Sequence, residues 1–174
     1  QSLTAGTPLT LTTNSFGRTG YTFAGWATSS GGSVVYTDGQ SVSLYGATTL
    51  YAKWTGITYT ITYHINGATG GSAPGNGSYT TGGTAYTVVG NTGSLTLSGY
   101  TFAGWNTLAN GSGSTVTSYS TSADITLYAI WNSNSTYRVD YSGNSSTAGT
   151  APTAQTVTPG GSVTVAANSG NFVR

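Results

Sequence analysis

The sequence Gly-Tyr-Thr-Phe-Ala-Gly-Trp at residues 20–26 recurs unchanged at residues 99–105. A second block, Leu-Tyr-Ala-Lys-Trp at residues 50–54, returns as Leu-Tyr-Ala-Ile-Trp at residues 127–131. Because both blocks recur at nearly the same spacing, the chain is organised as a tandem array with a period of about 78 residues. Repeats of this kind bury apolar surface against their neighbours, so one unit and its joints decide the fold.

A third repeated block sets the limits of the copies. Tyr-Thr-Ile-Thr-Tyr at residues 59–63 returns as Tyr-Arg-Val-Asp-Tyr at residues 137–141. Residues 1–14 also align with residues 155–168. The two partial copies are expected to be completed by a neighbouring repeat, by another chain, or not at all. The predicted domains are the C-terminal part of copy one at 1–56, a complete copy two at 57–132 and the N-terminal part of copy three at 133–174.

Copy two has the pattern of short strands separated by turns. Residues 58–65 alternate between apolar and polar side chains, which is typical of a half-buried strand. Asn66-Gly67 marks a turn and opens a Gly-rich loop. No ten-residue window has the 3.6-residue period of a helix, so we predict a mainly β fold with little or no helix. Further strands are predicted at residues 79–81, 85–89, 95–97, 100–105, 115–119 and 125–131.

Composition excludes several classes of function. Charged residues make up 4% of the chain and the formal net charge is +1, against a usual charged fraction of about 25%. Such a chain has no basic stripe for nucleic acid and no polybasic membrane anchor, and no apolar run has membrane length. The absence of cysteine excludes disulfides and thiolate metal sites. A surface with so little charge repulsion favours self-association, which suits an assembled extracellular structure.

The order of the repeated blocks resembles a known family. Copy two runs from the Tyr-Thr-Ile-Thr-Tyr strand through Gly-Tyr-Thr-Phe-Ala-Gly-Trp-Asn-Thr to Leu-Tyr-Ala-Ile-Trp, and nearly the whole chain follows this order. It resembles the InlB B-repeat, also called the Listeria–Bacteroides repeat. The resemblance implies a small β-grasp-like domain that occurs in tandem in large bacterial cell-surface proteins. It also implies spacer, adhesive or partner-binding roles, with no enzymatic activity and no cofactor.

Aromatic residues at equivalent positions of the copies predict a core. An exposed indole could stack on a sugar ring, but repetition of Trp26 as Trp105 and of Trp54 as Trp131 favours packing, with the indole N–H bonded to backbone. The predicted core consists of Tyr21, Phe23, Trp26, Leu50, Trp54, Tyr59, Ile61, Tyr63, Tyr100, Phe102, Trp105, Leu127, Trp131, Tyr137, Val139 and Tyr141.

The ionisable residues give little support for chemistry. His64 is the single histidine, and the three Asp residues fall on different positions of the repeat, so we predict neither a metal site nor a carboxylate pair. No Gly-x-Ser-x-Gly elbow accompanies the abundant Ser. Lys53 could form an isopeptide bond with an Asn or Asp, but its equivalent in copy two is Ile130, so this feature is not part of the repeat. We predict no catalytic residues.

Four Asn-x-Ser/Thr sequons lie in predicted loops, where a glycan can attach. A chain this rich in Asn and Ser contains about four such sequons by chance, so they remain candidates only. The candidate glycosylation sites are Asn76, Asn110, Asn134 and Asn144.

These observations predict a non-catalytic structural or adhesive segment of a bacterial cell-surface or extracellular filament protein. Its expected partners are neighbouring repeats or copies of itself, with partial repeats completed head to tail between chains by strand addition. The alternative is a carbohydrate- or protein-binding module of a surface adhesin, with a cell-surface glycan or protein as its partner. Neither hypothesis involves nucleic acid or a membrane segment in this chain.

Overall fold

The computed structural model describes residues 4–171 and residue 173. The predicted alignment of copies one and three includes residues 1–3, which lie outside the described residues. No helix occurs in the described chain, which confirms the prediction of a mainly β protein with little or no helix. Accordingly, none of the described segments is a helix with the length and hydropathy needed to cross a bilayer. The predicted boundaries of the three copies stay a prediction.

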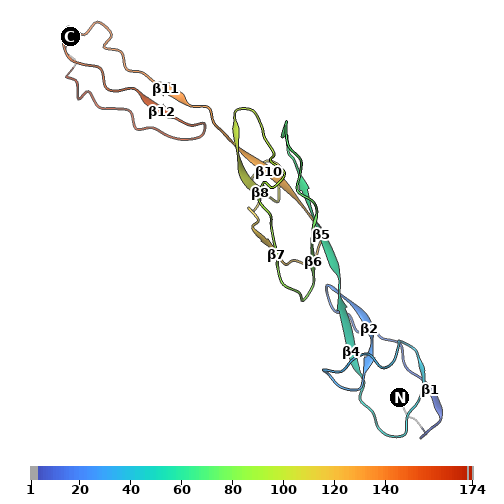
Figure 1. Cartoon of the computed structure of the whole chain (residues 1–174). Coiled ribbons are helices and arrows are strands. Elements are labelled where there is room, and N and C mark those ends of the chain that lie inside the picture. The colour runs from blue at the N-terminus through green and yellow to red at the C-terminus, as the bar shows by residue number, and fades with distance from the viewer. Residues whose placement is uncertain (1–3, 172, 174) are drawn as a thin grey trace. The chain divides into compact units, whose positions relative to one another are not determined.

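The strands are short and follow one another closely along the chain (Figure 1). In chain order they are β1 (Pro8–Thr10), β2 (Tyr21–Ala27), β3 (Ser41–Ser43), β4 (Tyr51–Gly56), β5 (Thr58–His64), β6 (Gly77–Thr80), β7 (Tyr86–Thr87), β8 (Tyr100–Asn106), β9 (Ser118–Tyr119), β10 (Ile125–Ser133), β11 (Tyr137–Val139) and β12 (Gln155–Val157).

The described chain divides into two compact units. The first runs to Thr62 and adds Gly75–Val88 and Val116–Thr126. The second consists of Tyr63–Pro74, Val89–Thr115 and the residues from Leu127 onward. Strands β5 and β10 each pass from the first unit into the second. In the first unit, β2 pairs antiparallel with β4 and β1 with β3. In the second, β8 pairs antiparallel with β10 and β11 with β12.

The repeat is reproduced in the backbone. In the β2–β4 pair the register shifts between Phe23 and Gly25, so Ala24 is the extra residue of a β-bulge. The β8–β10 pair has the same shift at Ala103, because Phe102 faces Trp131 and Gly104 faces Ile130. Gly25 and Gly104 follow the bulges with φ of 139° and 127°, which an L side chain rarely adopts. The Gly of the repeated Ala-Gly-Trp sequence is therefore a backbone requirement.

The bulge places one Phe ring between two Trp rings in each copy. Phe23 lies edge-on to Trp26 and Trp54, with ring centroids 5.0 Å and 5.6 Å apart. The equivalent Phe102 lies edge-on to Trp105 and Trp131, at 5.2 Å and 5.8 Å. Edge-to-face contacts at these distances add to the apolar burial of the rings.

Copy two contains a four-stranded sheet in the order β6-β5-β10-β8. Strand β6 is antiparallel to β5. Residue numbers increase in the same direction along β5 and along the segment that contains β10. The Thr60 amide donates to the carboxylate of Asp124, which directly precedes β10, and the His64 ring lies 5.2 Å from the Tyr128 ring. This order is that of parallel neighbours. The central strands bury Ile61 and Leu127 completely.

The structure places most of the predicted core residues in buried or half-buried positions. Trp26, Ile61, Tyr63, Trp105 and Leu127 are buried. Half-buried are Tyr21, Phe23, Leu50, Trp54, Tyr59, Phe102, Trp131, Val139 and Tyr141.

Two predicted core residues are exposed and correct the prediction. Tyr100 is 45% exposed and Tyr137 is 61% exposed. Tyr100 begins β8, and it lacks the Arg18 guanidinium that covers its equivalent Tyr21 at 3.8 Å from the ring centroid. Tyr137 begins β11, which in the described chain has a strand neighbour on one side only, whereas its equivalent Tyr59 lies in a strand flanked on both sides. Both tyrosines thus lack the neighbour that covers their counterparts.

The prediction of a strand at residues 95–97 is also corrected. This segment forms isolated bridges at Thr96 and Leu97 and no strand. Leu95 is nevertheless buried. The Asn91 side chain holds it in a loop by donating to the Leu95 carbonyl at 2.8 Å and accepting the Leu95 amide at 2.7 Å.

Candidate functional site

Copy two shows how the Trp of the repeat is used when the unit is complete. Trp105 donates its indole N–H to the carbonyl of Val89 at 2.9 Å. The ring of Tyr63, from β5, packs against Trp105 with centroids 4.7 Å apart. The Tyr63 hydroxyl accepts the amide of Val89 at 3.2 Å. One tyrosine of β5 therefore covers the indole and also fixes the backbone segment that satisfies it.

Copy one has the same Trp without this cover. The indole nitrogen of Trp26 is buried and has no hydrogen-bond partner among the described residues. A cavity of about 180 Å³ lies beside it, lined by Leu11, Thr12, Trp26 and Leu50. A buried donor without a partner costs about 1–3 kcal/mol, so this site is energetically incomplete.

The edges of the equivalent strands β4 and β10 differ in the same way. β10 is flanked by β8 and β5, and its residues Leu127 and Ala129 are fully buried. In the described chain β4 pairs with β2 alone, and the equivalent residues Leu50 and Ala52 are only half-buried. The outer edge of β4 therefore has no strand neighbour in the described chain.

A second feature is the tight joint between copies one and two. The linker residue Ile57 donates its amide to the Gly20 carbonyl of copy one at 2.9 Å. Its own carbonyl accepts the amide of Thr81, in copy two, at 3.0 Å. A Cβ on Gly56 would lie 2.2 Å from the Thr81 carbonyl oxygen, and one on Gly20 would lie 2.6 Å from the Ser122 hydroxyl. Both glycines therefore permit the close approach.

The joint that leads into copy three keeps one of these contacts and loses the other. Asn134 donates its amide to the Gly99 carbonyl at 2.8 Å, as Ile57 does to Gly20. Ser133 replaces Gly56, and Pro159 replaces Thr81. Proline has no amide to donate, so the second contact of the first joint has no counterpart. An open cavity of about 470 Å³ lies here, lined by Trp131, Asn132, Ser133, Thr158 and Pro159.

Sequence reasoning did not single out Gly20, Gly56 or Thr81. Two of the three positions differ between the joints, Gly56 to Ser133 and Thr81 to Pro159, but this difference alone does not indicate that the residues meet. These substitutions alter the steric and hydrogen-bonding properties that the first joint uses.

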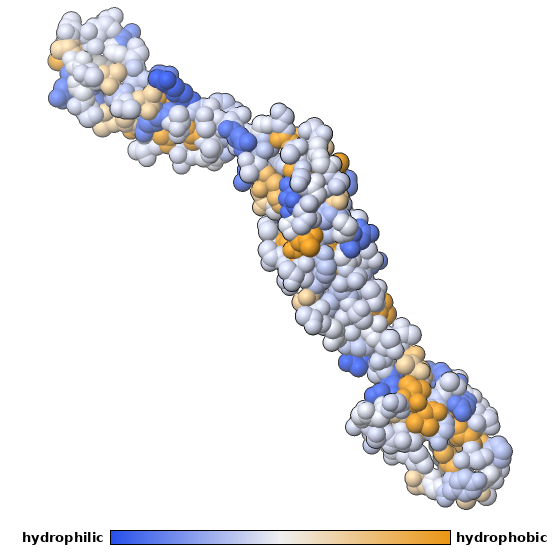
Figure 2. Space-filling model, in the orientation of Figure 1, coloured by the Kyte–Doolittle hydropathy of each residue, from blue (hydrophilic) through white to orange (hydrophobic). Residues whose placement is uncertain are grey.

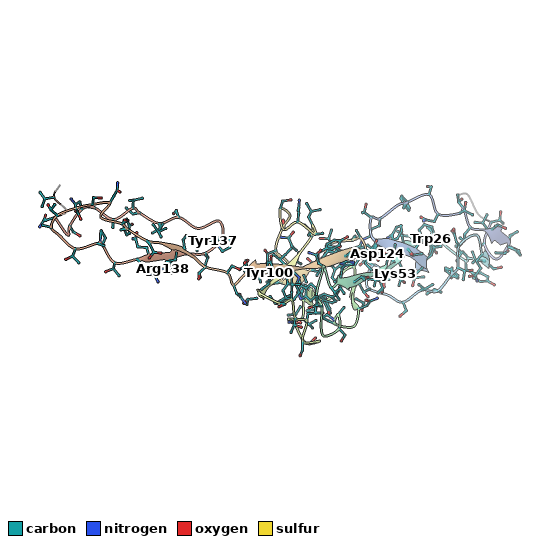
Figure 3. The ribbon with its side chains drawn as sticks, turned by 90° about the horizontal axis from the view of Figure 1, so that it is seen from above. Trp26, Lys53, Tyr100, Asp124, Tyr137 and Arg138 are labelled. Carbon is teal, nitrogen blue, oxygen red and sulfur yellow. The ribbon has the colours of Figure 1, made fainter. Side chains whose placement is uncertain are left out.

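The ionisable side chains serve the backbone or the surface. Asp38 accepts the Asn14 amide at 2.8 Å, and Asp124 accepts the Thr60 amide at 2.7 Å. Arg138 pairs with Asp140 at 2.7 Å, and both side chains are exposed. Figure 3 places Arg138 and Tyr137 on the same strand, β11. An exposed pair of this kind contributes little stability.

His64 and Lys53 are likewise engaged in local contacts. The Nδ1 atom of His64 accepts the Asn66 amide at 3.1 Å. Lys53 donates to the Ser30 carbonyl at 3.3 Å. Within the described residues, no group of three His, Asp or Glu side chains lies close enough to hold a metal ion. The candidate glycosylation sites Asn76, Asn110, Asn134 and Asn144 are all exposed.

Tyr119, in β9, has an altered pKa. Burial raises the pKa of Tyr119 above its usual value of 10.0, with smaller contributions from the negative charge of Asp124 and from Tyr59. Its hydroxyl donates to the Ala123 carbonyl at 2.6 Å. The phenol is thus held in its protonated form as part of the packing.

The surface is nearly free of charge. On the face drawn in Figure 2, strongly hydrophilic residues are scattered, and most of the surface has intermediate hydropathy. This distribution agrees with the content of 4% charged residues and gives little long-range electrostatic attraction or repulsion.

Comparison with known proteins identifies the repeat. The family model described as the Listeria-Bacteroides repeat domain matches residues 1–53 and again residues 59–130. A search of curated proteins and a search of solved structures found no match. The two matched segments contain the bulges of both strand pairs, β2–β4 and β8–β10, and each match ends within the last strand of its pair.

Proposed function

Because the chain belongs to the Listeria-Bacteroides repeat domain family, a family of surface-protein repeat modules, we propose that it is a structural and adhesive segment of a bacterial cell-surface or extracellular filament protein. In this role each copy is a small β-rich repeat, and the joints transmit force from one repeat to the next. The parallel neighbours β5 and β10 are consistent with the β-grasp-like arrangement that the family resemblance implies.

The observation that carries the proposal is a pair of backbone hydrogen bonds that join Ile57 to Gly20 and to Thr81. Its amide is bonded to Gly20 and its carbonyl to Thr81, so both backbone groups of the linker are used, one toward each copy. A flexible linker would leave these groups to water. A closed linker supports a role in which copies keep a fixed connection under load.

The side chains that could perform chemistry are occupied otherwise. Asp38 and Asp124 accept backbone amides, and Asp140 pairs with Arg138. General acid–base catalysis needs a titratable group within reach of a substrate and matched to the working pH. These engagements support a non-catalytic role.

Pulling single molecules by their two ends tests the structural role. We expect cooperative unfolding of copy two, which releases roughly 76 residues with an extended length of about 260 Å at about 3.4 Å each, less the span of the folded copy. A chain that extends smoothly with no unfolding event would contradict the proposal.

The finer part of the proposal is assembly between chains. Copies one and three each have a strand with a free edge in the described chain, β4 and β11. Completion of one copy by another chain would generate a head-to-tail series. Light scattering at increasing protein concentration tests this, with a growing mass as the expected result and a constant monomer mass as the contradicting one.

The alternative, a carbohydrate-binding module, is favoured by one observation. Tyr45 is 82% exposed, and exposed aromatic rings are suitable platforms for sugar rings. A glycan array tests it: saturable binding that Tyr45→Ala abolishes without loss of stability would support this function. Equal binding by the unchanged chain and the variant would exclude Tyr45 from it.

A further inference from the structure

We propose that β5 and β10 form a shear pair that resists tension along the chain, and that the side chain of Asn66 strengthens it. A shear pair is defined as two neighbouring strands that a pull on the chain slides along each other. The inference rests on the structural role proposed above and names the strands and the bonds of copy two that resist the load.

The chain enters copy two at the start of β5 and leaves it at the end of β10. β4 ends at Gly56 and β5 begins at Thr58, so Ile57 alone connects the two strands. β10 ends at Ser133, and the chain continues from there toward β11. Tension along the chain is therefore applied to the first residue of β5 and to the last residue of β10.

These two points lie at opposite ends of a parallel strand pair. β5 and β10 are hydrogen-bonded neighbours in the four-stranded sheet. Near the start of β5, the amide of Thr60 donates to Asp124, directly before β10, at 2.7 Å. At the end of β5, the ring of His64 lies 5.2 Å from the ring of Tyr128, and β10 continues beyond it to Ser133. Tension therefore pulls the two strands in opposite directions along their length.

The direction of the pull decides how many bonds must break together. When two strands slide along each other, the bonds between them are stretched at the same time and share the load. When two strands separate from one end, the first bond takes the whole load and the others follow one by one. Because each hydrogen bond contributes little by itself, a pair loaded in shear survives a given tension for longer.

Asn66 adds bonds between the end of β5 and β10. Its Nδ2 atom donates to the Ala129 carbonyl, in β10, at 2.7 Å. The same atom donates to the Ala109 carbonyl at 2.8 Å. The indole N–H of Trp131, also in β10, donates to the Asn66 carbonyl at 2.9 Å. Since Asn66 follows β5 and its partners in β10 lie toward the exit of the chain, sliding of the strands stretches these bonds.

The backbone at Asn66 suggests a clean substitution. Asn66 has φ of 46°, a conformation that Gly adopts without a steric cost. Asn66→Gly therefore removes the two bonds of the side chain and keeps the backbone conformation. Asn91→Gly is the matched control, because the Asn91 side chain also makes two bonds, both with Leu95, at 2.8 Å and 2.7 Å. They lie in the loop between β7 and β8, outside the shear pair.

Single-molecule pulling on the full chain from two pairs of attachment points tests the direction. The natural sequence has no cysteine, so introduced cysteines fix where the force is applied. Thr55→Cys with Ser135→Cys loads β5 and β10 in shear. Thr55→Cys with Thr121→Cys pulls both strands from the same end and separates them one bond at a time. All three positions are exposed, so cysteine should be tolerated there.

The lifetime of folded copy two at one constant force is the quantity to compare. The lifetime should be several-fold longer in the shear geometry than in the geometry that separates the strands from one end. In shear, Asn66→Gly should shorten the lifetime about fivefold for each hydrogen bond that it removes, because the bonds broken in the transition state set the unfolding rate. Asn91→Gly should leave this lifetime nearly unchanged, since its bonds persist while the strands slide.

Urea unfolding of the two glycine variants shows that both fold and measures what each substitution costs without force. We expect similar losses in the free energy of unfolding, because each variant loses two side-chain hydrogen bonds. A lifetime in shear that falls in Asn66→Gly but not in Asn91→Gly then reports the load on Asn66 and not a general loss of stability.

The outcomes separate the inference from the function on which it rests. Equal lifetimes in the two geometries would overturn the shear pair, while cooperative unfolding of copy two would still support the structural role. Equal shortening of the lifetime in shear by Asn66→Gly and Asn91→Gly would overturn the role of Asn66. Smooth extension with no unfolding event would contradict the structural role and the shear pair together.

Discussion

The carbonyl oxygen of Thr81 lies 2.2 Å from the point where a Cβ on Gly56 would be. Real Cβ atoms do not approach a carbonyl oxygen so closely, and the obstacle is backbone that cannot rotate away. Gly56 ends β4, and Thr81 follows β6. The absence of a side chain at position 56 therefore permits Thr81 to close the joint by donating its amide to Ile57.

Replacement of Gly56 by Ala should open this joint. The added methyl group forces the backbone of Thr81 away, and such overpacking costs about 1–3 kcal/mol. Hydrogen exchange should show faster exchange at the Thr81 amide, and the midpoint of thermal unfolding should fall. Gly75→Ala is the control, because nothing lies within 4 Å of its Cβ position. Equal effects of the two variants would mean that the close approach at Gly56 is not important.

The second joint should become like the first when its two differing residues are exchanged. Pro159→Thr restores an amide that can donate to the Asn134 carbonyl, and Ser133→Gly removes the side chain at the position equivalent to Gly56. A hydrogen bond of about 1 kcal/mol slows exchange about fivefold. We expect this protection at the residue 159 amide in the double variant.

The two single variants decide whether the positions are coupled. Pro159→Thr alone should gain little protection if the side chain of Ser133 prevents the close approach that Gly56 permits in the first joint. Full protection in that single variant would show that the proline alone keeps the second joint open.

The sequence predicts the strands correctly where apolar and polar side chains alternate and the strand has a neighbour on each side. Residues 58–65 and 125–131 were predicted as strands and became β5 and β10. The prediction failed at residues 95–97, because an apolar pattern indicates that side chains are buried but does not specify whether the backbone forms a strand or a loop. Leu95 is buried in a loop that Asn91 holds together.

The joints were missed for a different reason. Their contacts join residues far apart in the sequence, such as Gly56 and Thr81, and no local pattern indicates which segments meet. The incomplete cover of Trp26 could not be predicted either, because the same six residues precede Trp26 and Trp105 in the sequence. The difference lies in the neighbouring strand, which the local sequence does not specify.

The two tryptophans should respond differently to replacement by Phe. Trp105→Phe removes the bond to the Val89 carbonyl and loosens the contact with Tyr63. Trp26→Phe removes a buried donor that has no partner, so part of the lost packing is offset. We expect Trp105→Phe to cost about 1–2 kcal/mol more than Trp26→Phe. Hydrogen exchange in β8 and in β2 measures the two local losses, and equal losses would contradict the incomplete bonding of Trp26.

Stability should fall in alkaline solution through Tyr119. Its pKa is raised above the usual 10.0, first by burial and then by Asp124 and Tyr59, so the folded state retains the proton when the unfolded chain has lost it. Below pH 10 both states are protonated and the pH has no effect through this group. Above pH 10 the unfolded state binds fewer protons than the folded state, and the free energy of unfolding decreases as pH rises through the folded pKa.

Tyr119→Phe should remove this part of the alkaline loss, although it costs about 1 kcal/mol at neutral pH because the bond to the Ala123 carbonyl is lost. Urea unfolding between pH 8 and pH 11 measures the slope, with pH limits chosen about the usual tyrosine pKa. Tyr45→Phe is the control, since the Tyr45 side chain is exposed. Asp124→Asn should lessen the slope, because it removes the negative charge that contributes to the raised pKa of Tyr119. Identical slopes in the unchanged chain and in Tyr119→Phe would show that Tyr119 does not govern the alkaline loss.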